Sequence, residues 1–339
     1  MRFDRWFLLG IAFLLVFVPA AIRYDVGTDY MSYLAIYQDS WRLESYKKEP
    51  GFYFINWFYQ SINAHFQWMF ATFAFIFTAV AFKAYPKKNA WLLHFLFFSM
   101  LWFFSLTGIR QAASLAFCLL ALFKFFEKQY FWFAITVVVA STFHQSAIVI
   151  GILGGLAMIP LPDNFKKRTA PLIFIVVIAI SYFVLGVMAV YIEKILVLIG
   201  LHKYASYFGG KFYIARTDGT GVMALTKVLI SVYILTRTKA LLEINDRYWI
   251  LAILVFLYAI SVVFAMNIVI FGRMAITFVF VMPIAIMLVF SLKVSKLNTL
   301  IILFLMAFYL IAFTKDGFGI ENSVHNPKLN PYQTIFEKR

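Results

Sequence analysis

Charged residues and cysteines are scarce in this chain. Only 13% of the 339 residues are charged, and there is one cysteine, Cys118. Soluble domains carry about a quarter charged residues, so the composition excludes an ordinary soluble protein. One cysteine excludes a disulfide within the chain and a zinc site built from several thiolates. The sequence also lacks a phosphate-binding glycine loop, a serine-nucleophile motif and any His, Asp or Glu cluster with metal-ligand spacing, so no metal site is predicted.

Apolar residues dominate instead, and they come in long runs. Hydrophobic residues make up 63% of the chain, with 41 phenylalanines. A helix needs about 20 apolar residues to span a bilayer, so the runs predict an all-α polytopic integral membrane helix bundle of about eleven passes. We expect one transmembrane domain over residues 1–339, whose first pass has no convincing signal-peptide cleavage site. The expected spans are 6–22, 66–82, 91–106, 112–126, two short passes within 130–159, 171–190, 221–235, 248–266, 274–292 and 297–313.

Basic residues come in clusters, and the clusters predict the orientation of the bundle. The net charge of +15 lies in small groups between apolar runs, as in membrane-protein loops and not as in a nucleic-acid surface. The groups share one side, the cytoplasmic one, only if the segment 130–159 crosses twice by turning at its polar centre. A single crossing would move every later cluster to the other side. The outer side then holds a loop with an interfacial helix at 23–65, a loop at 191–220 and a polar tail at 314–339.

Three arginines stand at the outer ends of apolar spans, where a charge near hydrocarbon is costly and is usually paired or functional. They are Arg23, Arg110 and Arg273. Arg110 and Arg273 each follow a glycine closely, and we expect each to open a helix that runs inward. A bound anion such as a diphosphate would satisfy both the helix N-terminus and the guanidinium fork. Alternatively, these arginines reach lipid head groups or pair with acidic residues of the first outer loop.

The first outer loop combines carboxylates with tyrosines. Thr28 is expected to cap a helix that carries Asp29 in its first turn, and Tyr30 and Tyr33 then share one face. Together with Asp25, this face offers the hydroxyl acceptors and flat apolar platforms that a sugar-binding groove needs. The alternative is an ordinary aromatic belt at the membrane interface.

Glu49 and His144 are two further candidates. Glu49 precedes Pro50, and proline suits the first turn of a helix, so Glu49 would lie at the positive end of that helix as a functional group or a simple cap. His144 lies in an apolar segment among polar neighbours. It is either a satisfied core histidine or a base, a proton relay or a donor to phosphate.

Several short motifs occur in an order and spacing that resemble a known family. They are Arg-x-x-x-Gly-Thr-Asp-Tyr-x-x-Tyr from Arg23, Glu-Pro-Gly-Phe from Glu49, Arg-Gln-Ala from Arg110, Phe-His-Gln-Ser-Ala from Phe143, Gly-Arg from Gly272 and Asn-Pro-Tyr from Asn330. Over nearly its whole length, the chain is similar to the EpsG-like, Wzy-type polysaccharide polymerases. The resemblance implies a GT-C-like glycosyltransferase of the bacterial inner membrane. Such an enzyme joins oligosaccharide repeat units carried on undecaprenyl diphosphate into O-antigen or another surface polysaccharide, at the periplasmic face and without cofactors.

With this reaction in view, the candidate residues receive roles. The arginines would stabilise the diphosphate leaving group, and a base would take the proton of the acceptor hydroxyl. The expected diphosphate ligands are Arg110, Arg273 and Arg23; the candidate bases are His144, Asp29 and Glu49; and the expected sugar-binding residues are Asp25, Tyr30, Tyr33 and Gln111. His144 is favoured as the base because it is deep and has polar neighbours.

The expected partners are the lipid-linked donor and acceptor, membrane lipids, a chain-length regulator and a flippase, with no nucleic acid. Two other functions stay open at this point. One is a flippase or exporter of lipid-linked glycans, in which the arginines bind diphosphate but no bond breaks. The other is a membrane O-acyltransferase, in which His144 is the base.

Overall fold

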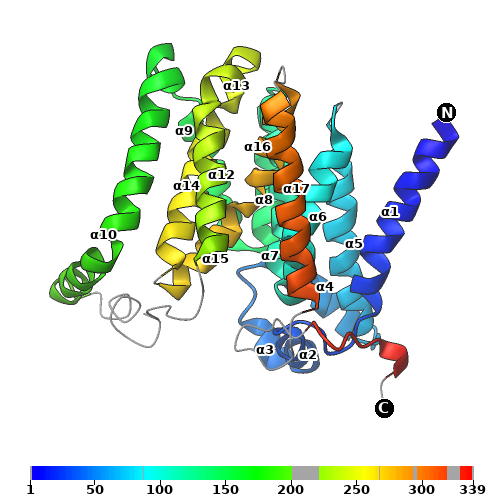
Figure 1. The fold of residues 1–339 in the computed structure, drawn as a ribbon. Coiled ribbons are helices and arrows are strands. Elements are labelled where there is room, and N and C mark those ends of the chain that lie inside the picture. Colours follow the sequence, from blue (N-terminus) through cyan, green and yellow to red (C-terminus); the bar gives the residue numbers. More distant parts are fainter. Residues whose placement is uncertain are drawn as a thin grey trace. The chain divides into compact units, whose positions relative to one another are not determined.

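The computed structural model describes residues 2–86, 88–200, 221–266, 268–292, 296–318 and 329–337, and its regular elements there are helices (Figure 1). The chain divides into two compact units. The first unit comprises Met1–Ile152 and Lys293–Arg339, and the second comprises Leu153–Leu292. The all-α prediction is confirmed for the described residues.

The first unit is built around α7. Its helices are α1 (Arg2–Ile22), α2 (Tyr30–Gln38), α3 (Ser40–Glu44), α4 (Pro50–Ser61), α5 (Gln67–Lys83), α6 (Ala90–Thr107), α7 (Ile109–Phe126), α8 (Tyr130–Phe143), the start of α9 (Ile148–Ala157) and α17 (Lys296–Gly317). Helix α7 packs against α5, α6 and α8. Its alanines Ala112, Ala113, Ala116 and Ala121 are fully buried. Small side chains let neighbouring helices approach closely, which explains why α7 occupies the centre.

The predicted break within 130–159 is present, with one helix on each side of it, and the two membrane crossings stay a prediction. Helix α8 ends at Phe143, His144 adopts an extended conformation, and a short 3-10 turn at Gln145–Ala147 leads into α9. The close contact between α8 and α9 shows that the chain reverses direction at this break. A Cβ added at Gly151 of α9 would lie 3.1 Å from the side chain of Val137 in α8. A helix is also present where the interfacial helix was predicted, as α4, with Pro50 in its first turn, and its place at the membrane interface stays a prediction.

The second unit contains the end of α9, α10 (Ala170–Leu198), α12 (Val222–Thr236), α13 (Thr238–Ile244), α14 (Trp249–Ala265), α15 (Val269–Val279) and α16 (Val281–Ser291). Helix α14 packs against α10, α12 and α15. Helix α10 continues to Leu198, past the predicted loop start at residue 191, because the sequence stays largely apolar there. The rest of the predicted 191–220 loop, from residue 201, lies outside the described residues.

Three described helices are long and apolar enough to cross a bilayer. They are Ala90–Thr107, Ile109–Phe126 and Asp246–Ala265, and the pair Phe271–Val279 and Val281–Ser291, bent by 45°, counts as a fourth if it forms one span. Shorter apolar helices of 10–17 residues occupy other predicted spans. The protein is therefore a helical membrane protein, whereas eleven passes and a GT-C-like architecture stay predictions.

Candidate active site

Glu49, Arg110 and His144, which are far apart in the sequence, meet at one end of the first unit. Arg110 Nη1 donates to Glu49 Oε2, and His144 Nδ1 lies 2.9 Å from Glu49 Oε1. The backbone N–H of Gln145 also donates to Glu49 Oε1, at 3.4 Å. The Glu49 side chain is only 9% exposed, whereas those of Arg110 and His144 are 20% and 28% exposed. The carboxylate therefore lies beneath two more accessible partners.

Local sequence explains how each of the three side chains is placed. Glu49 is the N-cap residue of α4, and Pro50 fixes the start of that helix. Arg110 is the second residue of α7, after the N-cap residue Gly108, so the predicted helix start is confirmed. His144 occupies the extended break after α8, where its side chain is not held on a helix face.

Glycine at position 51 brings α4 and α8 together. A Cβ at Gly51 would lie 2.5 Å from Thr142 Oγ1 and 3.2 Å from the Thr142 carbonyl oxygen. A larger residue fits there only if the Thr142 side chain or one of the two helices moves. This close approach sets Glu49, two residues earlier, within reach of His144, two residues after Thr142.

The electrostatics fix the protonation pattern of the site. A carboxylate only accepts hydrogen bonds, so the Nδ1 that faces Glu49 carries the proton and the Nε2 of a neutral His144 is left as an acceptor. Burial alone would raise the pKa of Glu49, but the hydrogen bond from His144 and the charge of Arg110 outweigh it and hold that pKa below the ordinary value. Glu49 is therefore ionised and well paired, which makes it a poor base.

Aromatic rings surround the guanidinium of Arg110. Its central carbon lies 4.6 Å from the ring centre of Tyr46, 5.1 Å from that of Phe52 and 6.0 Å from that of Tyr33. Cation–π contacts stabilise a partly buried arginine and orient its fork. The sequence reasoning missed Tyr46 and Phe52. Phe52 ends the Glu-Pro-Gly-Phe motif and so had a signal, whereas nothing in the sequence marked Tyr46.

Arg23, the second predicted diphosphate ligand of this unit, is buried elsewhere. Its side chain is 2% exposed, donates through Nη1 to the carbonyl oxygens of Val26 and Leu106, and lies over the rings of Tyr30 and Phe70. This placement favours a structural role over contact with a substrate.

The predicted sugar-binding face of α2 points into the core. Tyr30 and Tyr33 do share a face, but they are 0% and 5% exposed, and Tyr30 stacks on Phe70 with ring centres 4.4 Å apart. The N-cap residue of α2 is Asp29 without a side-chain cap bond, so the prediction that Thr28 caps this helix is wrong. Asp29 is exposed, while Asp25, with a positive φ of 52°, and Gln111 are partly exposed.

Arg273 belongs to the second unit. It is exposed and is the fifth residue of α15, which starts at Val269. The prediction that Arg273 opens a helix is therefore wrong, because the apolar residues before Gly272 already form the first turn. Its role as a diphosphate ligand stays a prediction.

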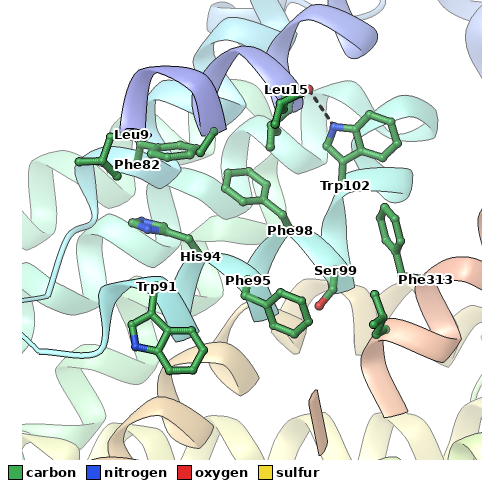
Figure 2. Close-up of a pocket in the computed structure, with 13 residues that line it drawn as sticks. Leu9, Leu15, Phe82, Trp91, His94, Phe95, Phe98, Ser99, Trp102 and Phe313 are labelled. Atoms are coloured by element: carbon green, nitrogen blue, oxygen red, sulfur yellow. Dashed lines mark hydrogen bonds between the residues drawn. The ribbon is translucent and has the colours of Figure 1, made fainter. Parts of the chain in front are cut away.

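An apolar cavity of about 560 Å³ lies along α6 in the first unit (Figure 2). It is lined by Leu9, Ala12, Leu15 and Val16 of α1, Phe82 of α5, Trp91, His94, Phe95, Phe98, Ser99 and Trp102 of α6, and Leu310 and Phe313 of α17. The polar side chains of the lining bond to main-chain carbonyls: His94 to Ala81, Ser99 to Leu96 and Trp102 to Val16. The cavity therefore suits hydrocarbon.

The comparisons with known proteins agree with the helical architecture and the motifs. The model of the EpsG family matches residues 6–334, nearly the whole chain. The chain belongs to the EpsG family and is thus a membrane protein of the polysaccharide-polymerase type. No curated protein and no solved structure matches it.

Proposed function

We propose that the protein is a glycosyltransferase of the bacterial inner membrane. It joins oligosaccharide repeat units, carried on undecaprenyl diphosphate, into O-antigen or another surface polysaccharide at the periplasmic face. The observation that carries the proposal is the convergence of Glu49, Arg110 and His144, because it puts an oriented base beside a cation. Family membership supports the polymerase class.

The donor half of the reaction needs a cation. The bond between the anomeric carbon and the diphosphate oxygen breaks, and negative charge grows on the lipid diphosphate. Arg110, partly exposed and oriented by Glu49 and the surrounding rings, stabilises that charge in the transition state. Arg273 is the second proposed diphosphate ligand, and arginine suits this task because its planar fork binds two phosphate oxygens.

The acceptor half needs a base. A sugar hydroxyl of the second lipid-linked unit attacks the anomeric carbon, and His144 Nε2 takes its proton as the new carbon–oxygen bond forms. Glu49 holds Nδ1–H in place and stabilises the imidazolium that results. This division of labour favours His144 over Glu49 and Asp29 as the base, because the lowered pKa of Glu49 weakens it as a base and Asp29 has no such orienting partner among the hydrogen bonds that the structure gives.

The remaining candidates serve binding. Asp25, Asp29 and Gln111 lie at or near the surface and are proposed to contact sugar hydroxyls. The cavity along α6 is proposed to take the isoprenoid tail, since its lining is mostly apolar. A chain-length regulator and a flippase are the proposed protein partners.

The test is product analysis with the purified chain in vesicles that contain the undecaprenyl-diphosphate-linked repeat unit. We expect glycans longer than one unit, and we expect Glu49→Gln to reduce them strongly. Glu44→Gln is the matched control, because Glu44 is an exposed glutamate of the same outer loop, paired with Lys47. Relocated but unextended substrate would contradict the polymerase and indicate a flippase. An acylated sugar would indicate an acyltransferase, which the same His144–Glu49 pair could serve.

A further inference from the structure

The C-terminal segment Leu329–Glu337 is docked on the first unit beside the end of α1 (Figure 1). The backbone N–H of Tyr24 donates to the carbonyl oxygen of Gln333 at 2.8 Å, and Arg23 pairs with Thr334 in an antiparallel bridge. Leu329 is 4% exposed and packs in a cluster with Ala20, Ala21, Val26 and Leu106. Tyr332 donates its hydroxyl hydrogen to the carbonyl oxygen of Pro19. The Asn-Pro-Tyr motif therefore lies in a segment with defined contacts.

Arg23 connects this docked segment to the C-terminal end of α6. Its main chain pairs with the segment, and its buried guanidinium reaches the carbonyl oxygen of Leu106. Leu106 lies in the last turn of α6, where carbonyls lack partners within the helix and a cation is favourable. The backbone at Gly27 also packs closely against the Leu106 carbonyl oxygen, because a Cβ at this position would lie 2.3 Å from it. The φ of Gly27 is +97°, which favours glycine.

The end of α6 is also connected, by one short turn, to the start of α7, where Arg110 lies. Thr107 ends α6, Gly108 forms the turn, and Arg110 is the second residue of α7. Leu106 and Arg110, whose guanidinium contacts Glu49, are only four residues apart across this turn. The contacts thus run from the C-terminal segment through Arg23 and Leu106 to Arg110.

We infer that Arg23 and the docked segment Leu329–Glu337 are positioning elements, which fix the turn between α6 and α7 and thereby hold Arg110 against Glu49. The segment completes the active-site end of the unit from a distant part of the chain. The geometric part of this inference is independent of the proposed function, and its effect on catalysis rests on that function.

The first experiment measures the Glu49–Arg110 pair without any substrate. The pair, with His144, lowers the pKa of Glu49, so it stabilises the fold at neutral pH and less as the carboxyl protonates in acid. The unfolding temperature is measured in detergent from about pH 6 to about pH 3 for the wild type, Glu49→Gln, Leu329→Asn and a chain lacking residues 329–339. Asparagine disrupts the buried site of Leu329 without adding a group that titrates in this range. We expect both segment variants to lose the part of the acid-induced fall in unfolding temperature that comes from Glu49, as Glu49→Gln does.

Phe336→Ala is the matched control, because Phe336 lies in the same segment but is 82% exposed. It should keep the wild-type pH dependence. If the segment variants only lower the unfolding temperature by the same amount at every pH, the segment is merely structural and the inference is wrong. Should the shortened chain fail to fold, Tyr332→Phe, which removes one hydroxyl bond, is read in the same way.

The second experiment measures catalysis. We expect Leu329→Asn to lower kcat about tenfold with little change in KM, and to add nothing to the loss caused by Arg110→Lys, because both changes misplace one cation. Fully additive losses in the double variant would overturn the inference. A wild type that makes no polymer would instead contradict the proposed function, and the unfolding experiment would still decide the positioning role.

Discussion

Glu49 contacts two partners that stabilise its charge, and this sharing is the reason that another residue is proposed as the base. A carboxylate that accepts bonds from both Arg110 and His144 has a lowered pKa and little tendency to take a proton. A neutral histidine whose Nδ1–H is held by that carboxylate has the opposite property, since its other ring nitrogen is free to accept. At this scale the proposed roles are a carboxylate that orients the histidine, a cation that binds diphosphate, and a histidine that acts as the base.

Replacing His144 by glutamine tests the base directly. Glutamine can still donate to Glu49, so folding should be preserved, but it cannot take the acceptor proton. We expect polymer formation to fall roughly 100- to 10,000-fold, while donor binding persists because Arg110 remains. Activity is measured at saturating lipid-linked repeat unit. Asp29→Asn changes a rival candidate base and should weaken acceptor binding more than the chemical step, and the assignment of the base is wrong if Asp29→Asn is inactive and His144→Gln is active.

The ion pair predicts a definite pH dependence of stability. Because the folded-state pKa of Glu49 lies below its ordinary value of 4.5, its contribution is present above that value and is lost as the pH falls through the folded-state pKa. The unfolding temperature of the wild type in detergent should therefore fall as the pH falls through this acidic range. In Glu49→Gln, the unfolding temperature should fall less over the same range. If the unfolding temperature of Glu49→Gln falls with pH as steeply as that of the wild type, other carboxylates cause the pH dependence.

At the scale of elements, the contact of α4 with α8 sets the distance between Glu49 and His144. In Gly51→Ala, the new methyl group would overlap Thr142, so the Thr142 side chain or one helix must shift. A displacement of about 1 Å at a catalytic group can cost roughly 100-fold in rate. We expect a large loss of kcat, partly recovered by adding Thr142→Ala, which removes the clashing hydroxyl. Gly10→Ala, at a glycine with open space around it, should have no effect.

The cavity along α6 gives a second prediction for an element. Ala12→Phe would fill part of the cavity from α1 and exclude part of an isoprenoid tail. Each methylene kept from burial costs about 0.8 kcal/mol, so losing two contacts raises KM roughly tenfold. A short-chain substrate analogue should keep its KM. The control is Leu8→Phe, on the same helix but 64% exposed, and an equal rise for both substrates would contradict tail binding.

Local signals in the sequence predicted the elements better than the contacts between them. Pro50 marked the start of α4, the polar run around His144 marked the break after α8, and Gly108 marked the start of α7. All three are properties of a few consecutive residues. Which of Asp25, Asp29 or Glu49 would meet Arg110 depended on packing between helices, and periodicity carries no such information. The burial of Arg23 likewise depends on the C-terminal segment, over 300 residues away in the sequence.

At the scale of the whole molecule, charge at the two ends of α7 suggests its orientation in the membrane. Helix α7 has 18 residues, which at 1.5 Å per residue is about 27 Å, close to the thickness of the bilayer core. Arg110 and the candidate site are at its start, and Lys124 and Lys128 are at or just after its end. Lysines gather at the cytoplasmic ends of spans, so the site end is expected outside.

Cysteine labelling from outside the cell tests this orientation, in a Cys118→Ser background that removes the native thiol. A cysteine at position 39, next to α2 in the first outer loop, should react with a membrane-impermeant reagent. Cysteines at Lys128 and Lys167 should react only after the membrane is opened, because both lie in basic clusters assigned to the cytoplasm.

The two lysine positions test different parts of the predicted topology. External labelling at 128 would invert the first unit and place the Glu49–Arg110–His144 site in the cytoplasm, which would contradict polymerisation at the periplasmic face. Protection at 128 with external labelling at 167 would instead mean that the chain does not return across the membrane after turning at His144, and the predicted number of passes would fall by one.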